Sequence, residues 1–365
     1  MGSILITGGA GFIGANFTRQ WRRDNPGDEI IVLDALTYAG NRESLDGVDG
    51  IAFEHGDIRD QDQVERLLGS HAIDRIVHFA AESHVDRSIH GPDAFIDTNI
   101  VGTHVLLKAA KAVWLDRGSG KPHRFHHVST DEVYGSLGPE DPPFSETTPY
   151  APNSPYSATK AASDHLVRAY HHTYRLQTTI SNCSNNYGPY QFPEKLIPLF
   201  LLNALHGRAL PIYGDGRQRR DWLHVEDHCR GIALVLASGR PGEVYNIGGG
   251  AELENLTVID TLCAAVDAAF AGDRSLARRF PDAPAARGLA TTSLKTTVAD
   301  RPGHDRRYAI NAHKIAGELG YAPAHGFGEW FAETLNWYLE NEPWWRRVLD
   351  GSYRDWLTTN YATRD

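Results

Sequence analysis

The segment Thr7-Gly8-Gly9-Ala10-Gly11-Phe12-Ile13-Gly14 follows an apolar run, Ser3–Thr7, that predicts a β-strand. A helical pattern follows it and runs to about Arg23. The glycines satisfy two spacings, G-x-G-x-x-G from Gly9 and G-x-x-G-x-x-G from Gly8. Glycine lets the backbone turn tightly and approach a pyrophosphate, and the start of the next helix offers N–H groups. The segment therefore predicts a dinucleotide-binding turn at the start of an α/β fold.

An acidic residue, Asp34, ends the second predicted strand, which begins at Ile30. A carboxylate at this position accepts hydrogen bonds from the ribose hydroxyls of NAD and repels the 2′-phosphate of NADP. The alternative is a tight turn with a capping Asp. Asp57 follows the third predicted strand, where it either contacts the adenine amino group or caps the next helix. We predict NAD as the cofactor.

Short apolar runs alternate with helical patterns through the first half of the chain, with further strands at 75–79 and 125–129. This alternation predicts a parallel sheet covered on both faces, which binds ligands at the carboxyl ends of its strands. Prolines and loops become frequent after about Asn185. We predict a Rossmann-type doubly wound parallel sheet with a smaller α/β substrate-binding domain. The predicted division is 1–186 plus about 223–248 for the NAD-binding domain, and 187–222 plus 249–365 for the substrate-binding domain.

Two features of the second half carry separate expectations. Residues 264–292 are rich in Ala and Arg with little periodicity after the first helix, and we interpret them as a surface excursion. The last helical patterns contain Trp330, Trp337 and Trp344, which we expect in the core.

The composition limits the possible partners. The 365 residues carry a formal net charge of −10, which argues against nucleic acid. No run of 18 apolar residues is present, so we expect no membrane partner. The first strand begins at once and leaves no room for a signal peptide, so we expect a cytoplasmic protein. The three cysteines lack metal-ligand spacing, so we expect buried, reduced thiols and no metal site.

Tyr156 and Lys160 lie four residues apart at the start of a predicted helix that runs to about Tyr174. This spacing places the phenol and the ammonium on one face, where the cation favours the phenolate. Such a tyrosine can take a proton from a substrate hydroxyl while hydride passes to NAD. The pattern Y-x-x-x-K alone is common by chance on surface helices. Beside a dinucleotide-binding turn, it predicts an oxidation site.

The segment Ser129–Gly135 follows the fifth predicted strand and contains Thr130, Asp131 and Glu132. A hydroxyl there can hold the reacting oxygen. Two neighbouring carboxyl groups raise each other's pKa, so that one can donate a proton while the other accepts one. The alternative is a solvated acidic loop.

Long motifs make the chain resemble the dTDP-glucose 4,6-dehydratase family, within the extended short-chain dehydrogenases/reductases. Besides the segments above, the resemblance rests on Leu36–Asn41, Ala80–Ser88, Asn185–Pro189, Pro193–Lys195, Pro211–Gly214, Arg220–Trp222 and Asp300–His304. The chain departs from the family at Ala35, where Lys is usual, in a shorter 134–156 segment, and at 271–298.

The resemblance implies roles for individual residues. Tyr156 would be the oxidising base with Lys160 beside it, Thr130 would hold the sugar, Asp131 would be the acid, and Glu132 the base at C5. The implied NAD contacts, besides Tyr156 and Lys160, are Gly8, Gly11, Phe12, Ile13, Gly14, Asp34, Leu36, Thr37, Asp57, Ile58, Ala80, Ala81, Glu82, Thr98 and Asn186. The implied nucleotide-sugar contacts, besides Thr130, are Ser83, His84, Asn185, Lys195, Leu196, Pro211, Ile212, Tyr213, Arg220, Asn255, Arg301 and His304.

The basic members of this set, Lys195, Arg220, Arg301 and His304, suit a diphosphate. A single Lys or Arg is more often a solvated charge, and His84 could equally be structural.

The implied reaction removes water across C5 and C6 of a nucleotide-bound glucose and carries hydride from C4 to C6 through NAD. One alternative is a UDP-glucose 4,6-dehydratase, because the sequence does not separate the two nucleotides. Epimerases and decarboxylases of the same fold need the Tyr–Lys pair but no Asp–Glu pair. A regulatory nucleotide-binding protein would have a broken Tyr–Lys pair. The family and the Trp-rich helices imply a homodimer, with the pairing face left open.

Overall fold

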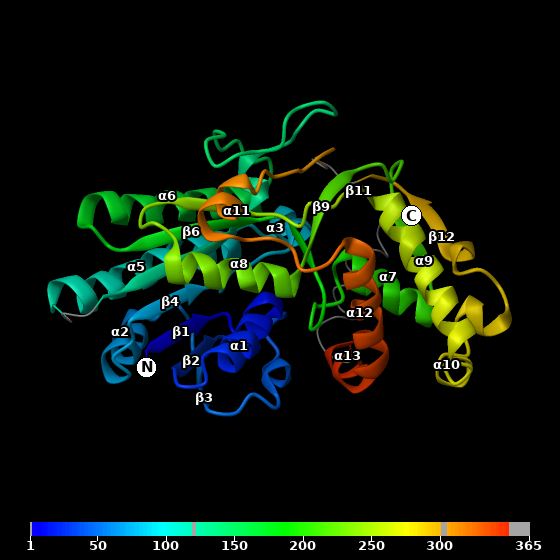
Figure 1. Ribbon diagram of the computed structural model, residues 1–365, viewed down its shortest axis with the longest axis horizontal. Helices are drawn as coiled ribbons and strands as arrows, with labels where there is room; N and C mark the ends of the chain where they lie inside the picture. The colour runs from blue at the N-terminus through cyan, green and yellow to red at the C-terminus, as the bar shows by residue number, and fades with distance from the viewer. Residues whose placement is uncertain (1, 119–121, 301–304, 350–365) are drawn as a thin grey trace.

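A seven-stranded parallel sheet organises the first half of the chain and takes one further strand from the second half (Figure 1). The computed structural model describes residues 2–118, 122–300 and 305–349. All neighbouring strands of this sheet are parallel, in the order β10-β6-β5-β4-β1-β2-β3. Its strands are β1 (Ser3–Thr7), β2 (Glu29–Asp34), β3 (Ile51–His55), β4 (Arg75–His78), β5 (Arg124–Thr130), β6 (Thr178–Cys183) and β10 (Val244–Ile247). The predicted Rossmann-type fold is confirmed.

Helices cover both faces of this sheet, which explains why the centres of β1 and β2, Ile4–Ile6 and Ile30–Leu33, are continuously apolar. On one face, α1, α8 and α11 share a core with Ile4, Val32 and Tyr245. On the other face, α2, α5 and α6 bury Leu5, Ile31 and the neighbouring side chains. The bounds of these helices are Phe12–Asp24 (α1), Gln61–Ser70 (α2), Thr103–Lys111 (α5), Pro155–Tyr174 (α6), Val225–Ser238 (α8) and His313–Leu319 (α11).

The segment between β4 and α5 combines short helices of different kinds. It contains α3 (Val85–His90), α4 (Asp93–Phe95) and a π-helical segment, Ile96–Gly102, and a second π-helical segment, Ala112–Asp116, follows α5. The first π-helical segment carries Asn99, whose Nδ2 donates to Thr159 Oγ1 (2.9 Å) and to the Glu82 carbonyl oxygen (3.0 Å). This contact fixes the loop after β4 against α6.

A second group of elements lies beside the carboxyl edge of the large sheet, at the right of Figure 1. It contains a three-stranded sheet, β11-β9-β7, and a two-stranded sheet, β12-β8. The strands are β7 (Asn185–Tyr187), β8 (Leu210–Tyr213), β9 (Arg219–His224), β11 (Glu252–Glu254) and β12 (Lys295–Val298). The helices are α7 (Leu196–Leu205), α9 (Asn255–Gly272), α10 (Leu276–Arg279), α12 (Phe327–Glu340) and α13 (Glu342–Leu349). Trp330 and Trp344 are buried in this group's core and Trp337 packs against it, as predicted.

The interpretation of residues 264–292 as a surface excursion is wrong. Leu276, Phe280 and Ala283 are buried in the second core, and the Thr291 hydroxyl donates to Asp267 at 2.5 Å. These three apolar residues keep helical spacing, but prolines at 281 and 284 interrupt the helix and hide the periodicity. Short 3₁₀ turns at Pro284–Arg287 and Thr291–Leu294 follow the interrupted helix. Two further 3₁₀ turns lie at Arg42–Leu45 and Asp131–Tyr134.

One helix of the described residues, α9, is long and apolar enough to cross a membrane by length and composition alone. Its side chains Val258, Leu262 and Val266 are fully buried in the second core. Those side chains therefore serve the packing of this core against α7 and α12. The three cysteines are buried and free, as the sequence predicts.

Candidate active site

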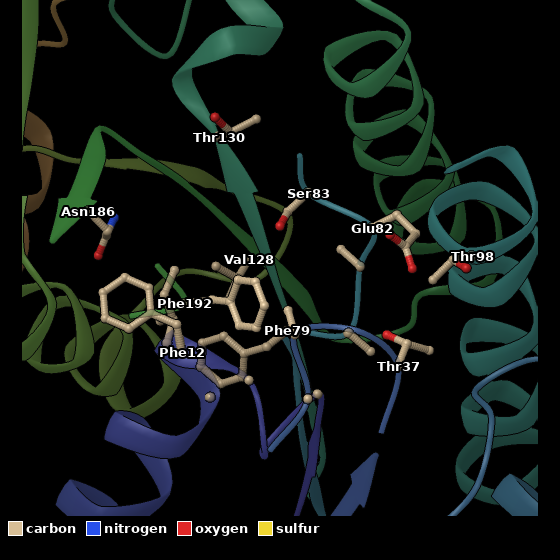
Figure 2. A pocket seen from close by; sticks show the side chains of 18 of the residues that line it. Phe12, Thr37, Phe79, Glu82, Ser83, Thr98, Val128, Thr130, Asn186 and Phe192 are labelled. Atoms are coloured by element: carbon tan, nitrogen blue, oxygen red, sulfur yellow. The ribbon is translucent and has the colours of Figure 1, made fainter. Parts of the chain in front are cut away.

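A cavity of about 390 Å³ opens at the carboxyl ends of the large sheet's strands. In Figure 2, Thr37 and Thr98 lie on one side of it, Asn186 on the opposite side, and Thr130 at the end of β5 above them. Predicted residues that line the cavity are Gly8, Gly11, Phe12, Ile13, Gly14, Asp34, Thr37, Asp57, Ile58, Ala80, Ala81, Glu82, Ser83, Thr98, Thr130, Asp131, Glu132, Tyr156, Lys160, Asn185, Asn186, Lys195 and Leu196. The structure therefore brings the predicted cofactor, oxidation and acid–base residues into one space.

The glycine-rich turn fits a dinucleotide because it leaves no room for side chains. Gly8 has φ +68°, and a Cβ on it would lie 2.5 Å from the Ala80 nitrogen. A Cβ on Gly14 would lie 2.2 Å from the Gly8 carbonyl oxygen. Gly11 begins α1 as its N-cap and has no side chain with which to cap it. The first turn of α1 can thus present backbone N–H groups to a pyrophosphate.

Asp34 is buried at the end of β2 and is held from both sides. Its Oδ2 accepts from the Ala10 nitrogen and its Oδ1 from the Leu36 nitrogen, both at 2.8 Å. Burial raises the pKa of this carboxyl, and the two backbone hydrogen bonds oppose that rise. Each oxygen keeps a second lone pair for a ribose hydroxyl. Leu36 is not among the residues that line the cavity, and its backbone, with φ 49°, supports Asp34; its cofactor contact stays a prediction.

Asp57 lines the cavity together with Arg59, whose guanidinium lies 2.7 Å from the Asp57 carboxylate. Burial acts to raise the pKa of Asp57, but the hydrogen bonds from Arg59 outweigh it and lower the pKa. The helix α2 is capped by Asp60, which accepts from the Gln63 nitrogen at 3.0 Å. The capping alternative for Asp57 is therefore wrong, and its carboxylate remains at the cavity.

Tyr156 and Lys160 lie in the first turns of α6, which begins after a capping box between Ser154 and Ser157. Both are buried, and the Lys160 Nζ donates to the Val128 carbonyl oxygen at 2.8 Å. Burial raises the pKa of Tyr156 well above its usual range, while a hydrogen bond from Thr130 opposes the rise. Burial also lowers the pKa of Lys160. The ionisation of this pair therefore depends on the charges around it.

The Asp131 side chain is 2% exposed at the carboxyl end of β5. Its Oδ1 lies 3.4 Å from the Thr130 hydroxyl, and its Oδ2 has no hydrogen-bond partner among the described residues. Burial and the neighbouring carboxylates of Glu132 and Asp221 raise its pKa well above the usual range. A protonated carboxyl at this position has a hydrogen to donate, as the adjacent acidic residues predict.

Several predicted substrate residues are not among those that line this cavity, and their contacts with the substrate stay predictions. His84 caps α3 through Nδ1, 3.4 Å from the Arg87 nitrogen, which favours its structural role. Arg220 is buried over the ring of Tyr308, 4.4 Å from its centroid, and donates to the Asp305 carbonyl oxygen at 2.8 Å. Pro211, Ile212 and Tyr213 form most of β8, and Asn255 begins α9, also outside the cavity. Arg301 and His304 lie outside the described residues.

The cavity also contains residues that the sequence reasoning did not assign, among them Tyr38, Cys183, Phe192 and Glu194. The Tyr38 hydroxyl donates to Glu194 Oε1 at 3.1 Å, which joins the segment after β2 to the segment before α7. Burial raises the pKa of Glu194 to about 7. Both residues fall in motifs quoted above, but no pattern of spacing marks them as partners.

The parallel sheet, the glycine-rich turn and the buried Tyr–Lys pair define an extended short-chain dehydrogenase/reductase. A family profile described as GDP-mannose 4,6 dehydratase matches residues 5–334. The chain belongs to the dTDP-glucose 4,6-dehydratase family within this class.

Relatives with this name share about half of the sequence. The dTDP-glucose 4,6-dehydratase of Xanthomonas campestris pv. campestris (strain B100) is 54% identical over 97% of this chain and 98% of the relative. The dTDP-glucose 4,6-dehydratase 1 of Escherichia coli (strain K12) is 51% identical over 99% of both. A crystal structure of the Streptomyces venezuelae enzyme with NAD and dTDP bound has a TM-score of 0.83 at 49% identity and covers 95% of this chain and 99% of that one.

The first prediction concerns the choice of dinucleotide. The purified protein should prefer NAD to NADP, because the Asp34 carboxylate repels a 2′-phosphate. Asp34→Asn should weaken NAD binding about ten- to hundredfold, which is the range expected for the loss of a hydrogen bond to a charged group. It should also reduce the preference for NAD over NADP. Competition binding measures both, and Asp57→Asn is the control, since it should not change the preference. Tight NADP binding with which NAD fails to compete would contradict the assignment of Asp34.

Proposed function

We propose that this protein converts dTDP-glucose to dTDP-4-keto-6-deoxyglucose with NAD as an internal hydride carrier from C4 to C6. The observation that carries the proposal is that Tyr156 and Lys160 share one cavity with Asp131 and Glu132. An epimerase of this fold has no use for the second pair. The two relatives are dTDP-glucose 4,6-dehydratases, which supports dTDP-glucose over UDP-glucose as the substrate.

The chain's own groups divide the proton transfers. Tyr156 takes the proton of the C4 hydroxyl, while Thr130 holds the sugar. Bound NAD supplies the hydride acceptor at C4 and afterwards the hydride donor at C6. Glu132 takes the C5 proton, and Asp131 gives its proton to the C6 hydroxyl, which leaves as water. Glu132 then returns a proton to C5, so that the dinucleotide is unchanged at the end and one water has been lost. The proton that Tyr156 took is released and Asp131 takes one up, which returns both groups to their starting states.

The geometry supports this assignment of acid and base. Asp131 is the more buried carboxyl, and its raised pKa keeps a proton available for the leaving oxygen. Glu132 is half-buried at the same strand end. A group that must exchange a proton with C5 benefits from this partial exposure.

We propose that the remaining predicted residues divide between cofactor and substrate as the family resemblance implies. For Lys195, the proposed role is contact with the nucleotide sugar. It lines the cavity and donates to the carbonyl oxygen of Ser83, another predicted substrate residue, at 3.2 Å. We also propose the domain division at 186/187, 222/223 and 248/249. The protein is proposed to be a cytoplasmic homodimer without membrane or nucleic-acid partners. The exposed apolar side chains Ile89, Ile96 and Val101 support a subunit contact.

Glu132→Gln keeps the size of the side chain but removes the base. The variant should still oxidise C4, seen as enzyme-bound NADH absorbance that accumulates before the first turnover is complete, and form keto-sugar about 10² to 10⁴ times more slowly. Tyr156→Phe is the matched control, because it should lose the NADH signal as well. Keto-sugar formation by Glu132→Gln at nearly the normal rate would disprove its role as the base.

Asp131→Asn removes the proton donor but keeps a polar side chain. The variant should bind dTDP-glucose normally and eliminate water slowly, because hydroxide is a poor leaving group without an acid. The 6-deoxy-6-fluoro analogue should recover most of the lost rate, since fluoride leaves without protonation. Rates of keto-sugar formation with the two substrates test this directly. An equal loss of rate with both substrates would show that Asp131 is not the acid.

A further inference from the structure

A third buried ionisable residue continues the Tyr–Lys pattern along α6. Tyr156, Lys160 and Asp164 follow one another at intervals of four residues, which places them on one face of the helix. The Asp164 side chain is 0% exposed. Burying a carboxylate costs free energy unless hydrogen bonds or an opposite charge offset the loss of water. The contacts of Asp164 identify these partners.

The groups that face Asp164 come from β5, from the loop before α6 and from α6 itself. Its Oδ2 accepts from the Ser129 hydroxyl (2.9 Å) on β5 and from the Tyr150 hydroxyl (3.0 Å) in the loop before α6. Its Oδ1 lies 3.3 Å from Nε2 of His127 on β5, but burial lowers the pKa of His127 well below its usual range and keeps it neutral. His165, the next residue on α6, also lowers the pKa of Asp164, and Asp164 in turn raises the pKa of the Tyr134 hydroxyl. Burial raises the pKa of Asp164 to about 6, and Lys160 opposes the rise.

Lys160 in turn has few groups that stabilise its charge. It is buried and donates to the Val128 carbonyl oxygen. Besides Tyr156, the ionisable groups that act on it or that it acts on, among the described residues, are Asp164, Cys183 on β6, His127 on β5 and His78 on β4. Burial raises the pKa of the Cys183 thiol and lowers that of both histidines, so these three groups are neutral. Asp164 is therefore the anion that opposes the desolvation of this ammonium.

We propose that Asp164 is a positioning residue that keeps the Lys160 ammonium charged and thereby lets Tyr156 act as a phenolate. The inference rests on the proposed roles of Tyr156 and Lys160. Asp164 lies about 6 Å from Lys160 and about 12 Å from Tyr156 along the helix, by the helical spacing. It therefore acts mainly through Lys160. The Tyr-x-x-x-Lys pattern becomes Tyr-x-x-x-Lys-x-x-x-Asp in this chain.

The direction in which the pKa of Tyr156 shifts distinguishes an action of Asp164 through Lys160 from a direct action on Tyr156. If Lys160 loses its proton when the carboxylate is removed, the pKa of Tyr156 rises. If Asp164 acted only on Tyr156, removing a negative charge would lower the pKa of Tyr156. Asp164→Asn should therefore move the acid limb of kcat/KM to higher pH by about one unit or more, given two unit charges at this separation in a buried site.

A direct titration provides a readout besides activity. The phenolate absorbance at 295 nm of the NAD-loaded enzyme, minus that of Tyr156→Phe, reports the ionisation of Tyr156. In Asp164→Asn the Tyr156 titration should shift to higher pH together with the acid limb. Asp164→Glu keeps a carboxylate and should bring both curves most of the way back to their wild-type positions. Ser163→Ala is the matched control, because it removes a buried neutral hydroxyl beside Asp164 and should leave both curves in place.

Lys160→Met tests the route of the effect. In that background Asp164→Asn should cause no further upward shift. If Asp164→Asn does not fold, Tyr150→Phe should move the acid limb in the same direction by less, because it removes a hydrogen bond that lowers the pKa of Asp164. The inference is overturned if the acid limb of folded Asp164→Asn stays in place or moves to lower pH. It is also overturned if Asp164→Asn causes an equal upward shift in the Lys160→Met background. Near-normal activity of Tyr156→Phe and Lys160→Met would instead overturn the proposed function.

Discussion

The packing of α6 against β5 removes the reacting groups of this protein from water, and the chemistry depends on that burial. Tyr156 and Lys160 on the helix and Asp131 at the strand end are each less than a tenth exposed. Desolvation disfavours the charged form of each group. It supplies a carboxyl that keeps its proton, which elimination needs, and it opposes the phenolate and the ammonium, which oxidation needs. The neighbouring charges must therefore select which group ionises.

The same edge of the sheet provides the rest of the site. The glycine-rich turn after β1 and the carboxylate at the end of β2 lie beside Ala80 after β4, because parallel strands bring their carboxyl ends together. The second group of elements closes the cavity with Asn185, Asn186 and Lys195. A dinucleotide and a sugar can thus be bound side by side by residues that directly follow the strands of the sheet.

Most of the sheet and of the reacting residues could be predicted from the sequence, because glycine spacing, strand alternation and the Tyr–Lys interval are local patterns. Contacts between distant segments could not. Some local contacts were also missed, because Leu36 supports Asp34 through its backbone and Arg59 pairs with Asp57 without a recognisable sequence pattern. Tyr38 meets Glu194 only after the chain has folded. The buried residues of 276–283 were missed because prolines interrupt their period.

The central claim is that one bound dinucleotide takes hydride from C4 and returns it to C6 of the same sugar. The most direct measurement uses dTDP-glucose deuterated at C4 and locates the label in the product by NMR. The account predicts deuterium at C6, and in heavy water it predicts solvent deuterium at C5, where Glu132 exchanges its proton. Deuterium retained at C4, as in an epimerase, or released on free cofactor, as in a simple dehydrogenase, would contradict it.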